Sequence, residues 1–337
     1  MKNMSTNNNI IFLVTGGAGF IGSHLVDLLL SQNYTVRVID NLANGSLDNL
    51  EEATKFSTYQ FIHGDILDDQ VREKAIAGVD YVFHLACLGV RQSLKDPFLN
   101  HRVNAEGTLK MLESSRKCGV KHFFYISSSE IYGKTNMFPI TEDALPNPLT
   151  VYGASKFVGE KYALAYLESF GISTSVFRIF NNFGPRAHYE GDAGEIIPRN
   201  IVYLLNDKQP VIFGDGSITR DFFFVKDTAK ALLELFVMRN KIVGETINIG
   251  TGVEVTLKEL IKKILRIMEK DAVGIRYHEG RPADVPRLWV NAKKFITLTS
   301  FKSACTLEEG LGETIEYYRN LMNNRDLLSE IVVENWK

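Results

Sequence analysis

Short apolar runs alternate with segments of helical periodicity through the first half of the chain. Residues 23–30, 100–117 and 152–168 show the helical pattern. The apolar runs that predict buried strands are residues 10–14, 34–39, 59–63, 81–85, 122–127 and 174–179. Alternation of this kind favours an α/β fold, in which a doubly wound parallel sheet is covered by helices on both faces.

The pattern changes after the sixth strand. Residues 181–194 are rich in Gly, Asn and Pro and indicate a long functional loop. Helices are then expected at residues 196–205, 228–238, 257–268 and 307–318, and strands at residues 211–213 and 221–225. These shorter elements predict a smaller C-terminal α/β cap, a substrate-binding domain over the sheet.

The domain boundaries follow from the same pattern. Residues 10–180 should form the sheet domain, to which the chain returns at about 216–250. Residues 181–215 and 251–323 should form the second domain. We expect residues 1–9 to be a disordered tail, and the pattern gives no assignment for residues 324–337.

Composition narrows the classes of function. The chain has 337 residues, 45% of them hydrophobic, which is enough for a large core. A net charge of −2 without a basic block argues against nucleic acid as a partner. Three widely spaced cysteines indicate neither a disulfide framework nor a metal site. No apolar run is long enough for a membrane span and no signal-peptide core is visible, so a cytoplasmic protein is expected.

The stretch 13–22, Leu-Val-Thr-Gly-Gly-Ala-Gly-Phe-Ile-Gly, lies between the first strand and the first helix. Glycines at 16, 19 and 22 allow a tight turn and bring backbone N–H groups close to a pyrophosphate at the helix N-terminus. Asp40 follows the second strand, at the right distance for a carboxylate on an adenosine ribose. A plain glycine-rich turn with a solvated Asp would explain these residues less well. The sequence therefore predicts a Rossmann-type domain that prefers NAD to NADP.

Tyr152 and Lys156 are four residues apart on a predicted helix and therefore share a face. An ammonium beside a phenol lowers the tyrosine pKa, which favours a phenolate that can take a proton from a substrate hydroxyl. Ser128 follows a predicted strand and could hydrogen-bond the reacting oxygen. For its neighbour Ser127 we prefer the role of a strand-end turn residue.

Seven motifs together resemble the extended short-chain dehydrogenase/reductase family, specifically the NAD-dependent nucleotide-sugar epimerases and dehydratases of the UDP-hexose 4-epimerase type. They are Thr-Gly-Gly-Ala-Gly-Phe-Ile-Gly, Gly64-Asp-Ile66, His84-Leu-Ala-Cys87, Val103-Asn-Ala-Glu-Gly-Thr108, Ser128-Ser-Glu-Ile-Tyr-Gly133, Tyr152 with Lys156, and Phe180-Asn-Asn-Phe-Gly-Pro185. The resemblance covers roughly residues 10–320. Cys87 departs from the usual Ala, and a small apolar residue there should be harmless.

The resemblance implies the residues that contact the cofactor. They are Gly16, Gly19, Phe20, Ile21, Gly22, Asp40, Asn41, Asp65, Ile66, Leu85, Ala86, Asn104, Tyr152 and Lys156. It implies a nucleotide-sugar substrate, UDP-linked, held by Ser129, Asn181, Asn200, Phe213, Arg220, Arg281 and Asp284. Two arginines that converge on a diphosphate are physically reasonable, because the guanidinium fork suits phosphate oxygens. The resemblance also implies a homodimer formed through the helices at 100–117 and 152–168, and a place in carbohydrate metabolism such as polysaccharide biosynthesis.

The reaction depends on the groups around the sugar. The catalytic set is Ser128, Glu130, Tyr152 and Lys156. An epimerase oxidises C4 and returns hydride to the other face. A 4,6-dehydratase also needs a base for the C5 proton, and its usual Asp-Glu pair is here Ser129-Glu130. That pair resembles UDP-glucuronate decarboxylases and some amino-sugar dehydratases, whereas most 4-epimerases lack the Glu. Glu130 could instead be a carboxylate ion-paired at a strand end.

Two loops favour the epimerase. Residues 187–195 and 281–286 are similar to epimerase substrate loops. Leu288 stands where hexose-only epimerases often have a gating Tyr, so a smaller gate could admit a bulkier sugar. We therefore predict a 4-epimerase, with a dehydratase or decarboxylase as the alternative. A non-catalytic NAD-binding regulator is the remote alternative, because such a protein needs no acid–base residues.

Overall fold

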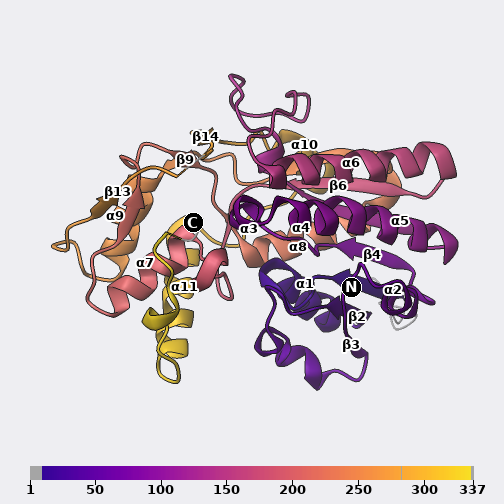
Figure 1. Cartoon of the computed structure of the whole chain (residues 1–337), viewed down its shortest axis with the longest axis horizontal. Helices are drawn as coiled ribbons and strands as arrows, with labels where there is room; N and C mark the ends of the chain where they lie inside the picture. The colour runs from indigo at the N-terminus through magenta and orange to yellow at the C-terminus, as the bar shows by residue number, and fades with distance from the viewer. Residues whose placement is uncertain (1–9, 282, 335–337) are drawn as a thin grey trace.

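The fold is organised around one parallel sheet (Figure 1). A computed structural model describes residues 10–281 and 283–334. The sheet has seven strands in the order β11-β6-β5-β4-β1-β2-β3, all parallel. They are β1 (Ile11–Thr15), β2 (Thr35–Asp40), β3 (Tyr59–His63), β4 (Tyr81–His84), β5 (His122–Ser128), β6 (Thr174–Ile179) and β11 (Thr246–Ile249). The order reverses between β1 and β4, and doubly wound sheets bind their ligands in the crevice at such a switch point.

Helices cover both faces of the sheet. One face packs on α1 (Phe20–Ser31), α8 (Val225–Val237) and α10 (Lys293–Thr299). The other packs on α2 (Asp69–Ile76), α5 (Gly107–Lys117) and α6 (Val151–Phe170). Because both faces are covered, the central strands are apolar along their length rather than alternating. The predicted Rossmann-type fold is confirmed, and β11 shows that the chain returns to the sheet after residue 215.

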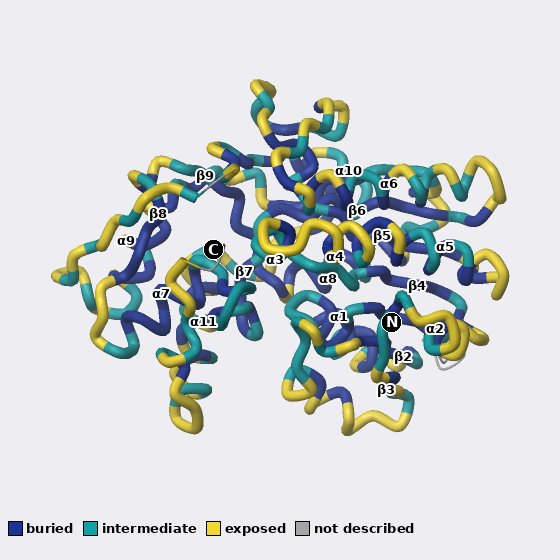
Figure 2. The backbone as a smooth tube through the Cα atoms, in the orientation of Figure 1, coloured by how far each residue is buried: buried dark blue, intermediate teal, exposed yellow. Residues whose placement is uncertain are grey.

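A smaller lobe stands beside the carboxyl end of the sheet (Figure 1). Its helices are α7 (Ile196–Leu205), α9 (Leu257–Ile267) and α11 (Leu307–Met322). Its short strands pair as β8 (Val211–Phe213) with β13 (Arg276–His278), β7 (Asn182–Phe183) with β10 (Phe223–Phe224), and β9 (Thr219–Arg220) with both β12 (Val255–Thr256) and β14 (Arg287–Leu288). The lobe has its own apolar core, visible as buried backbone in Figure 2.

Two predicted elements differ from the structure. The helix expected at 100–117 is broken into α4 (Pro97–His101), a π-helical turn (Arg102–Glu106) and α5. The strand expected at 221–225 is shorter in the structure, where only β10, Phe223–Phe224, falls in that range. Asp221 lies before β10 and outside any strand, and its buried carboxylate accepts hydrogen bonds from the backbone N–H groups of Thr251 and Gly252.

Leu288 does not act as the gate that the sequence suggested. It is fully buried in an apolar cluster with Ile140 and Phe180 and does not line the cavity described below. A bulkier sugar therefore gains no space from this residue.

The two terminal segments of the chain differ in how much of them the structure describes. The tail predicted at 1–9 lies outside the described residues. After α11, the segment left unassigned contains a short 3-10 helix (Leu328–Glu330), and Arg199 donates a hydrogen bond to the carbonyl of Val333. None of the helices in the described ranges is long and apolar enough to cross a membrane.

Candidate active site

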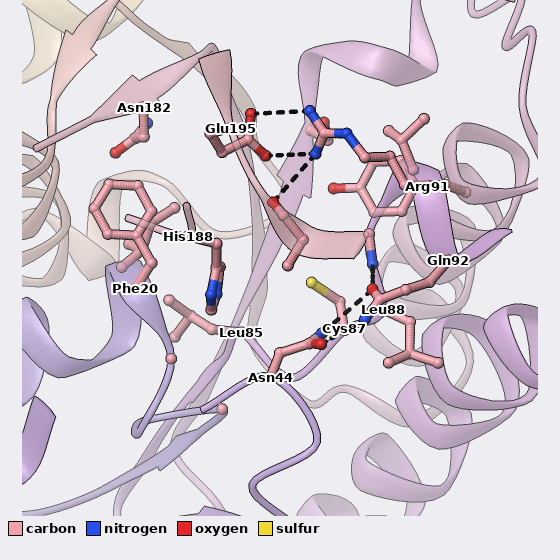
Figure 3. Close-up of a pocket in the computed structure, with 18 of the residues that line it drawn as sticks. Phe20, Asn44, Leu85, Cys87, Leu88, Arg91, Gln92, Asn182, His188 and Glu195 are labelled. Atoms are coloured by element: carbon pink, nitrogen blue, oxygen red, sulfur yellow. Dashed lines mark hydrogen bonds and ion pairs between the residues drawn. The ribbon is translucent and has the colours of Figure 1, made fainter. Parts of the chain in front are cut away.

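A cavity of about 600 Å³ lies between the carboxyl ends of the sheet strands and the smaller lobe. The turn after β1 forms one end of it, and residues of β8, β9 and the segment around 281–284 form the other. Figure 3 shows the part between them, where side chains from both lobes point toward one another. A long ligand that reaches from the glycine turn to the smaller lobe would fit this shape.

The glycine turn leaves room that any side chain would fill. Gly16 has a φ of +70°, and a Cβ there would lie 2.8 Å from the Cα of Ala86. A Cβ on Gly22 would collide with the carbonyl oxygen of Gly16. Only glycine satisfies both constraints, so the backbone can approach a pyrophosphate at the start of α1.

Asp40 shapes the adjacent corner of the cavity. Its Oδ2 accepts a hydrogen bond from the Ala18 N–H at 3.0 Å, and its Oδ1 accepts one from the Leu42 N–H at 2.8 Å. Burial raises the pKa of Asp40, and these two backbone donors oppose that rise. The carboxylate thus holds two loops in place and faces the cavity, where ribose hydroxyls could donate to it.

The other residues expected at the cofactor also line the cavity, with one exception. Lining residues are Gly16, Gly19, Phe20, Ile21, Gly22, Asp40, Asn41, Asp65, Ile66, Leu85, Ala86, Tyr152 and Lys156. The exception is Asn104, which is buried behind the cavity wall. Its amide accepts from the Leu88 N–H and donates to the Leu88 carbonyl, at 2.8 and 2.9 Å. Asn104 therefore holds the loop after β4 in place instead of contacting the cofactor.

Tyr152 and Ser128 meet in the middle of the cavity, between its two ends. Burial raises the pKa of Tyr152, and a hydrogen bond with Ser128 partly opposes the rise. The Lys156 ammonium donates to the carbonyl of Ile126 at 2.5 Å and lies over the ring of Tyr125. The lowering of the tyrosine pKa by Lys156 stays a prediction, and burial of the phenol is the largest influence on that pKa in this structure. Ser127 hydrogen-bonds to Glu160 at 2.5 Å, as a structural strand-end residue would.

Glu130 lies beside this group. Its backbone N–H donates to Ser128 Oγ at 3.2 Å, and its side chain faces the cavity. Burial raises the pKa of the Glu130 carboxyl, and the positive charge of Arg220 opposes the rise. Within the described ranges Glu130 has no ion pair, so the sequence alternative of a paired strand-end carboxylate is not realised.

The far end of the cavity carries arginines and an aromatic ring. Arg220 forms an ion pair with Asp284 at 2.7 Å, and the guanidinium of Arg281 lies 4.6 Å from the ring centre of Phe213. Burial lowers the pKa of Arg281 to about 9, so the guanidinium is still charged at neutral pH. Asn181 also lines the cavity, and its buried Oδ1 accepts no hydrogen bond from the residues that the structure describes. Such an orphaned acceptor favours a donor on a bound ligand.

One residue expected to bind substrate does not reach the cavity. The Asn200 amide exchanges hydrogen bonds with the backbone of Val211 and also donates to the carbonyl of Ile196. All of its polar atoms are thus used to join α7 to β8. Ser129, in contrast, lines the cavity as expected.

Several lining residues were not singled out from the sequence. Asn44, Arg91, Gln92, His188 and Glu195 surround the middle of the cavity, as Figure 3 shows. The side chains of Asn44 and Gln92 hydrogen-bond each other, and Arg91 pairs with Glu195. Glu195 and His188 belong to the loop whose resemblance to a substrate loop was noted, but no local motif marks their individual roles.

Comparison with known proteins shows the family to which the chain belongs. The model of the NAD dependent epimerase/dehydratase family matches residues 12–250. The chain belongs to that family. It is therefore an NAD-dependent enzyme of the extended short-chain dehydrogenase/reductase type, as the sequence motifs predicted.

Relatives in the family match almost the whole chain. A putative UDP-glucose 4-epimerase of Methanocaldococcus jannaschii is 38% identical over 322 residues, which are 94% of this chain and 100% of that protein. The solved UDP-N-acetylglucosamine 4-epimerase of Methanobrevibacter ruminantium M1 is 33% identical, with a TM-score of 0.87 over 94% of this chain and 100% of its own. The UDP-glucuronic acid 4-epimerase of Bacillus cereus, solved with NAD, is 32% identical, with a TM-score of 0.87 over 93% and 100%.

The residues of this family member fit NAD. The space at Gly16 and Gly22 admits a pyrophosphate, and the Asp40 carboxylate accepts hydrogen bonds from a ribose and repels an added phosphate. Cofactor and substrate can thus share one cavity, with Tyr152 and Ser128 between them.

Proposed function

We propose that this enzyme is a UDP-sugar 4-epimerase. The observation that carries the proposal is the position of Tyr152 and Ser128 between the glycine turn and the arginines, in one continuous cavity. That arrangement suits a sugar held between a dinucleotide and its own diphosphate. Residues 10–180 would bind the cofactor, and residues 181–215 and 251–323 the nucleotide sugar. The names of the relatives support the same reaction.

The chain supplies acid–base chemistry and orientation. When bound, NAD would supply the redox chemistry, as acceptor and then donor of the hydride at C4 of the sugar. Tyr152 takes the proton of the C4 hydroxyl and later gives it back to the same oxygen. Ser128 donates a hydrogen bond to that oxygen, and its hydroxyl is also the group that lowers the raised pKa of Tyr152. Between the two proton transfers the 4-keto sugar must turn its other face to the cofactor.

The diphosphate end provides the anchor for that rotation. Arg220 and Arg281 can bind the diphosphate while the ring of Phe213 contacts the base, so the sugar turns about a fixed point. The orphaned Asn181 acceptor then offers a hydrogen bond to a sugar hydroxyl.

A dehydratase or decarboxylase is the second candidate, because of Glu130. Its raised pKa and the lack of an ion pair within the described ranges suit a carboxyl group that exchanges protons. An epimerase has no step that needs this exchange. The charge pattern at the rest of the sugar site, described in the next subsection, does not favour a decarboxylase.

A panel of nucleotide sugars separates these reactions. The purified enzyme, with NAD, is incubated with UDP-glucose, UDP-N-acetylglucosamine, UDP-glucuronate and dTDP-glucose, and products are analysed by mass spectrometry and NMR. An epimerase gives a product of equal mass inverted at C4. Loss of water or of carbon dioxide would contradict the proposal, as would the absence of any turnover across the panel.

We also propose that the enzyme is a homodimer that associates through α5 and α6. Next to these helices, α4 carries Phe98, whose side chain is 81% exposed, and Leu99 and Leu94 are exposed nearby. Exposed apolar side chains grouped in this way favour a protein partner. Light scattering at micromolar concentration should give twice the mass of one chain, and Phe98→Glu should give the monomer. A monomeric wild-type protein would refute the proposal.

A further inference from the structure

Charged side chains of the two lobes face each other at the middle of the cavity. One set lies on α3 (Val90–Lys95) and the other on the segment 188–195. Each basic group there meets a carboxylate from that segment. The pairs are Arg91 with Glu195 at 3.1 Å and Lys95 with Asp192 at 2.6 Å, and within the segment His188 lies 2.7 Å from a carboxylate oxygen of Glu190. The segment thus pairs both cationic side chains of α3 before any ligand arrives.

The pair of Arg91 and Glu195 is the one that faces inward (Figure 3). Both terminal nitrogens of Arg91 donate to the two carboxylate oxygens of Glu195, at 3.1 and 3.5 Å, and one also donates to the carbonyl of Ala193. Glu195 precedes α7 as its N-cap, yet its side chain makes no capping hydrogen bond there. The carboxylate is therefore turned toward Arg91 at the expense of the helix end.

The charge state of the pair follows from its surroundings. Burial would by itself raise the pKa of Glu195, but the charge of Arg91, its hydrogen bonds and the charge of Arg281 together outweigh burial and hold that pKa below its usual value. At neutral pH Glu195 is ionised, and it compensates the guanidinium charge of Arg91.

The pair also lies close to the reacting groups. The charge of Glu195 acts on Tyr152, and that of Arg91 acts on Glu130. The charges of Arg220 and Arg281 also reach Glu130 and Glu195, respectively. The pair of Arg91 and Glu195 lines the cavity together with Tyr152, so we expect the sugar ring to meet this pair when its C4 hydroxyl is at Tyr152.

We propose that Glu195 makes the enzyme select nucleotide sugars with an uncharged sugar, a hexose or an N-acetylated hexosamine, over those whose sugar carries a carboxylate. This deepens the proposed function and rests on it. A sugar carboxylate would have to displace Glu195 from Arg91 or lie unpaired beside two glutamates, and both are costly in a partly desolvated site. The solved relatives described above include one named for an N-acetylated sugar and one named for glucuronic acid, so overall similarity does not decide between these classes.

The test compares kcat/KM for UDP-glucose and UDP-glucuronate in the NAD-loaded enzyme and two variants. Wild type should prefer UDP-glucose by at least about tenfold. Glu195→Gln keeps a hydrogen-bond acceptor for Arg91 but leaves the guanidinium charge of Arg91 uncompensated. The ratio of the two kcat/KM values should therefore move toward UDP-glucuronate by about tenfold or more. Arg91→Gln leaves Glu195 unpaired and should move the ratio the other way.

Asp192→Asn is the matched control. It removes a carboxylate from the same segment, but its partner Lys95 does not line the cavity and is 35% exposed, against 13% for the Arg91 side chain. Water screens the cation that this change releases, so the ratio should change by less than about twofold. A merely structural role of Glu195 would lower both activities together and leave their ratio unchanged.

Two results would overturn the inference: a wild-type preference for UDP-glucuronate, or shifts of the ratio in the same direction in Glu195→Gln and Arg91→Gln. If no sugar of the panel given above is turned over, the proposed function fails instead. Calorimetry of the NAD-loaded enzyme with the same two ligands then still tests the charge preference, because the Kd ratios should follow the same order. Equal affinities in wild type would contradict it.

Discussion

Replacing Tyr152 with Phe tests the core of the mechanism, because it removes one oxygen atom and leaves the ring. That oxygen is the proposed proton carrier, and it hydrogen-bonds with Ser128. General acid–base groups contribute about 100-fold to 10,000-fold to the rate, so kcat should fall by at least about 100-fold, or about 2.7 kcal/mol of transition-state stabilisation. The KM for the nucleotide sugar should change little, since the diphosphate end of the cavity supplies most of the binding contacts.

The cost in stability should be small by comparison. The lost hydrogen bond contributes about 1 kcal/mol or less, because water and Ser128 compete for the same hydroxyl at the cavity wall. Tyr81→Phe is the matched control. It removes a phenol oxygen that accepts a hydrogen bond from Arg239 at 3.2 Å, outside the cavity, and should leave kcat unchanged.

The assay follows interconversion of UDP-glucose and UDP-galactose by NMR, with thermal unfolding of both variants as the measure of stability. Turnover of Tyr152→Phe within about tenfold of wild type would remove the phenol from the mechanism. An equal loss of activity in Tyr81→Phe would show that the effect comes from packing rather than from proton transfer.

Three further outcomes follow from the same structure. In deuterium oxide the product of an epimerase should carry no deuterium at C5, and Glu130→Gln should change only the rate. Deuterium at C5 together with loss of water would instead identify Glu130 as the base of a dehydratase. Asp40→Ser should raise the affinity for NADP relative to NAD, measured by calorimetry, because the anion that repels the added phosphate is gone; an unchanged ratio would contradict the role given to Asp40. The free energy of unfolding should fall as the pH falls below about 6.5, because burial lowers the pKa of His24, His84 and His122 to about 3 in the folded chain. The unfolded chain then binds protons that the folded chain does not, which costs up to about 1.4 kcal/mol per pH unit for each histidine. Urea-unfolding midpoints that stay flat between pH 6.5 and 4.5 would refute this.

The sequence by itself determined the sheet and the cofactor, and it supplied the candidates for the reacting groups. Each of these depends on residues that are close together along the chain. The glycines at 16, 19 and 22 sit in one strand–turn–helix unit, and Tyr152 and Lys156 occupy one helix. Apolar strands that alternate with helices leave few arrangements other than a covered parallel sheet, so the strand ends that carry Asp40 and Ser128 had to meet at one edge.

Only the tertiary structure decided where individual polar groups find their partners. Asn104 and Asn200 carry amides suited to a ligand, but nearby backbone groups take their hydrogen bonds. Lys156 was expected beside the phenol of Tyr152, and the structure adds that its ammonium donates to the backbone carbonyl of Ile126. A buried donor binds the nearest acceptor in space, and neither propensity nor spacing along the chain reveals which acceptor that is.

The pair of Arg91 and Glu195 shows the same limit most clearly. The two residues are 104 positions apart, on a short helix of the large lobe and at the start of a helix of the small one. No local pattern links them. Their charges act on the sugar site only because the fold brings the loop after β4 and the substrate loop to opposite walls of one cavity. The sequence determined which chemical groups are available at this site. Tertiary contacts decided which of their charges remain uncompensated for the substrate, because electrostatic compensation depends on distance in space rather than along the chain.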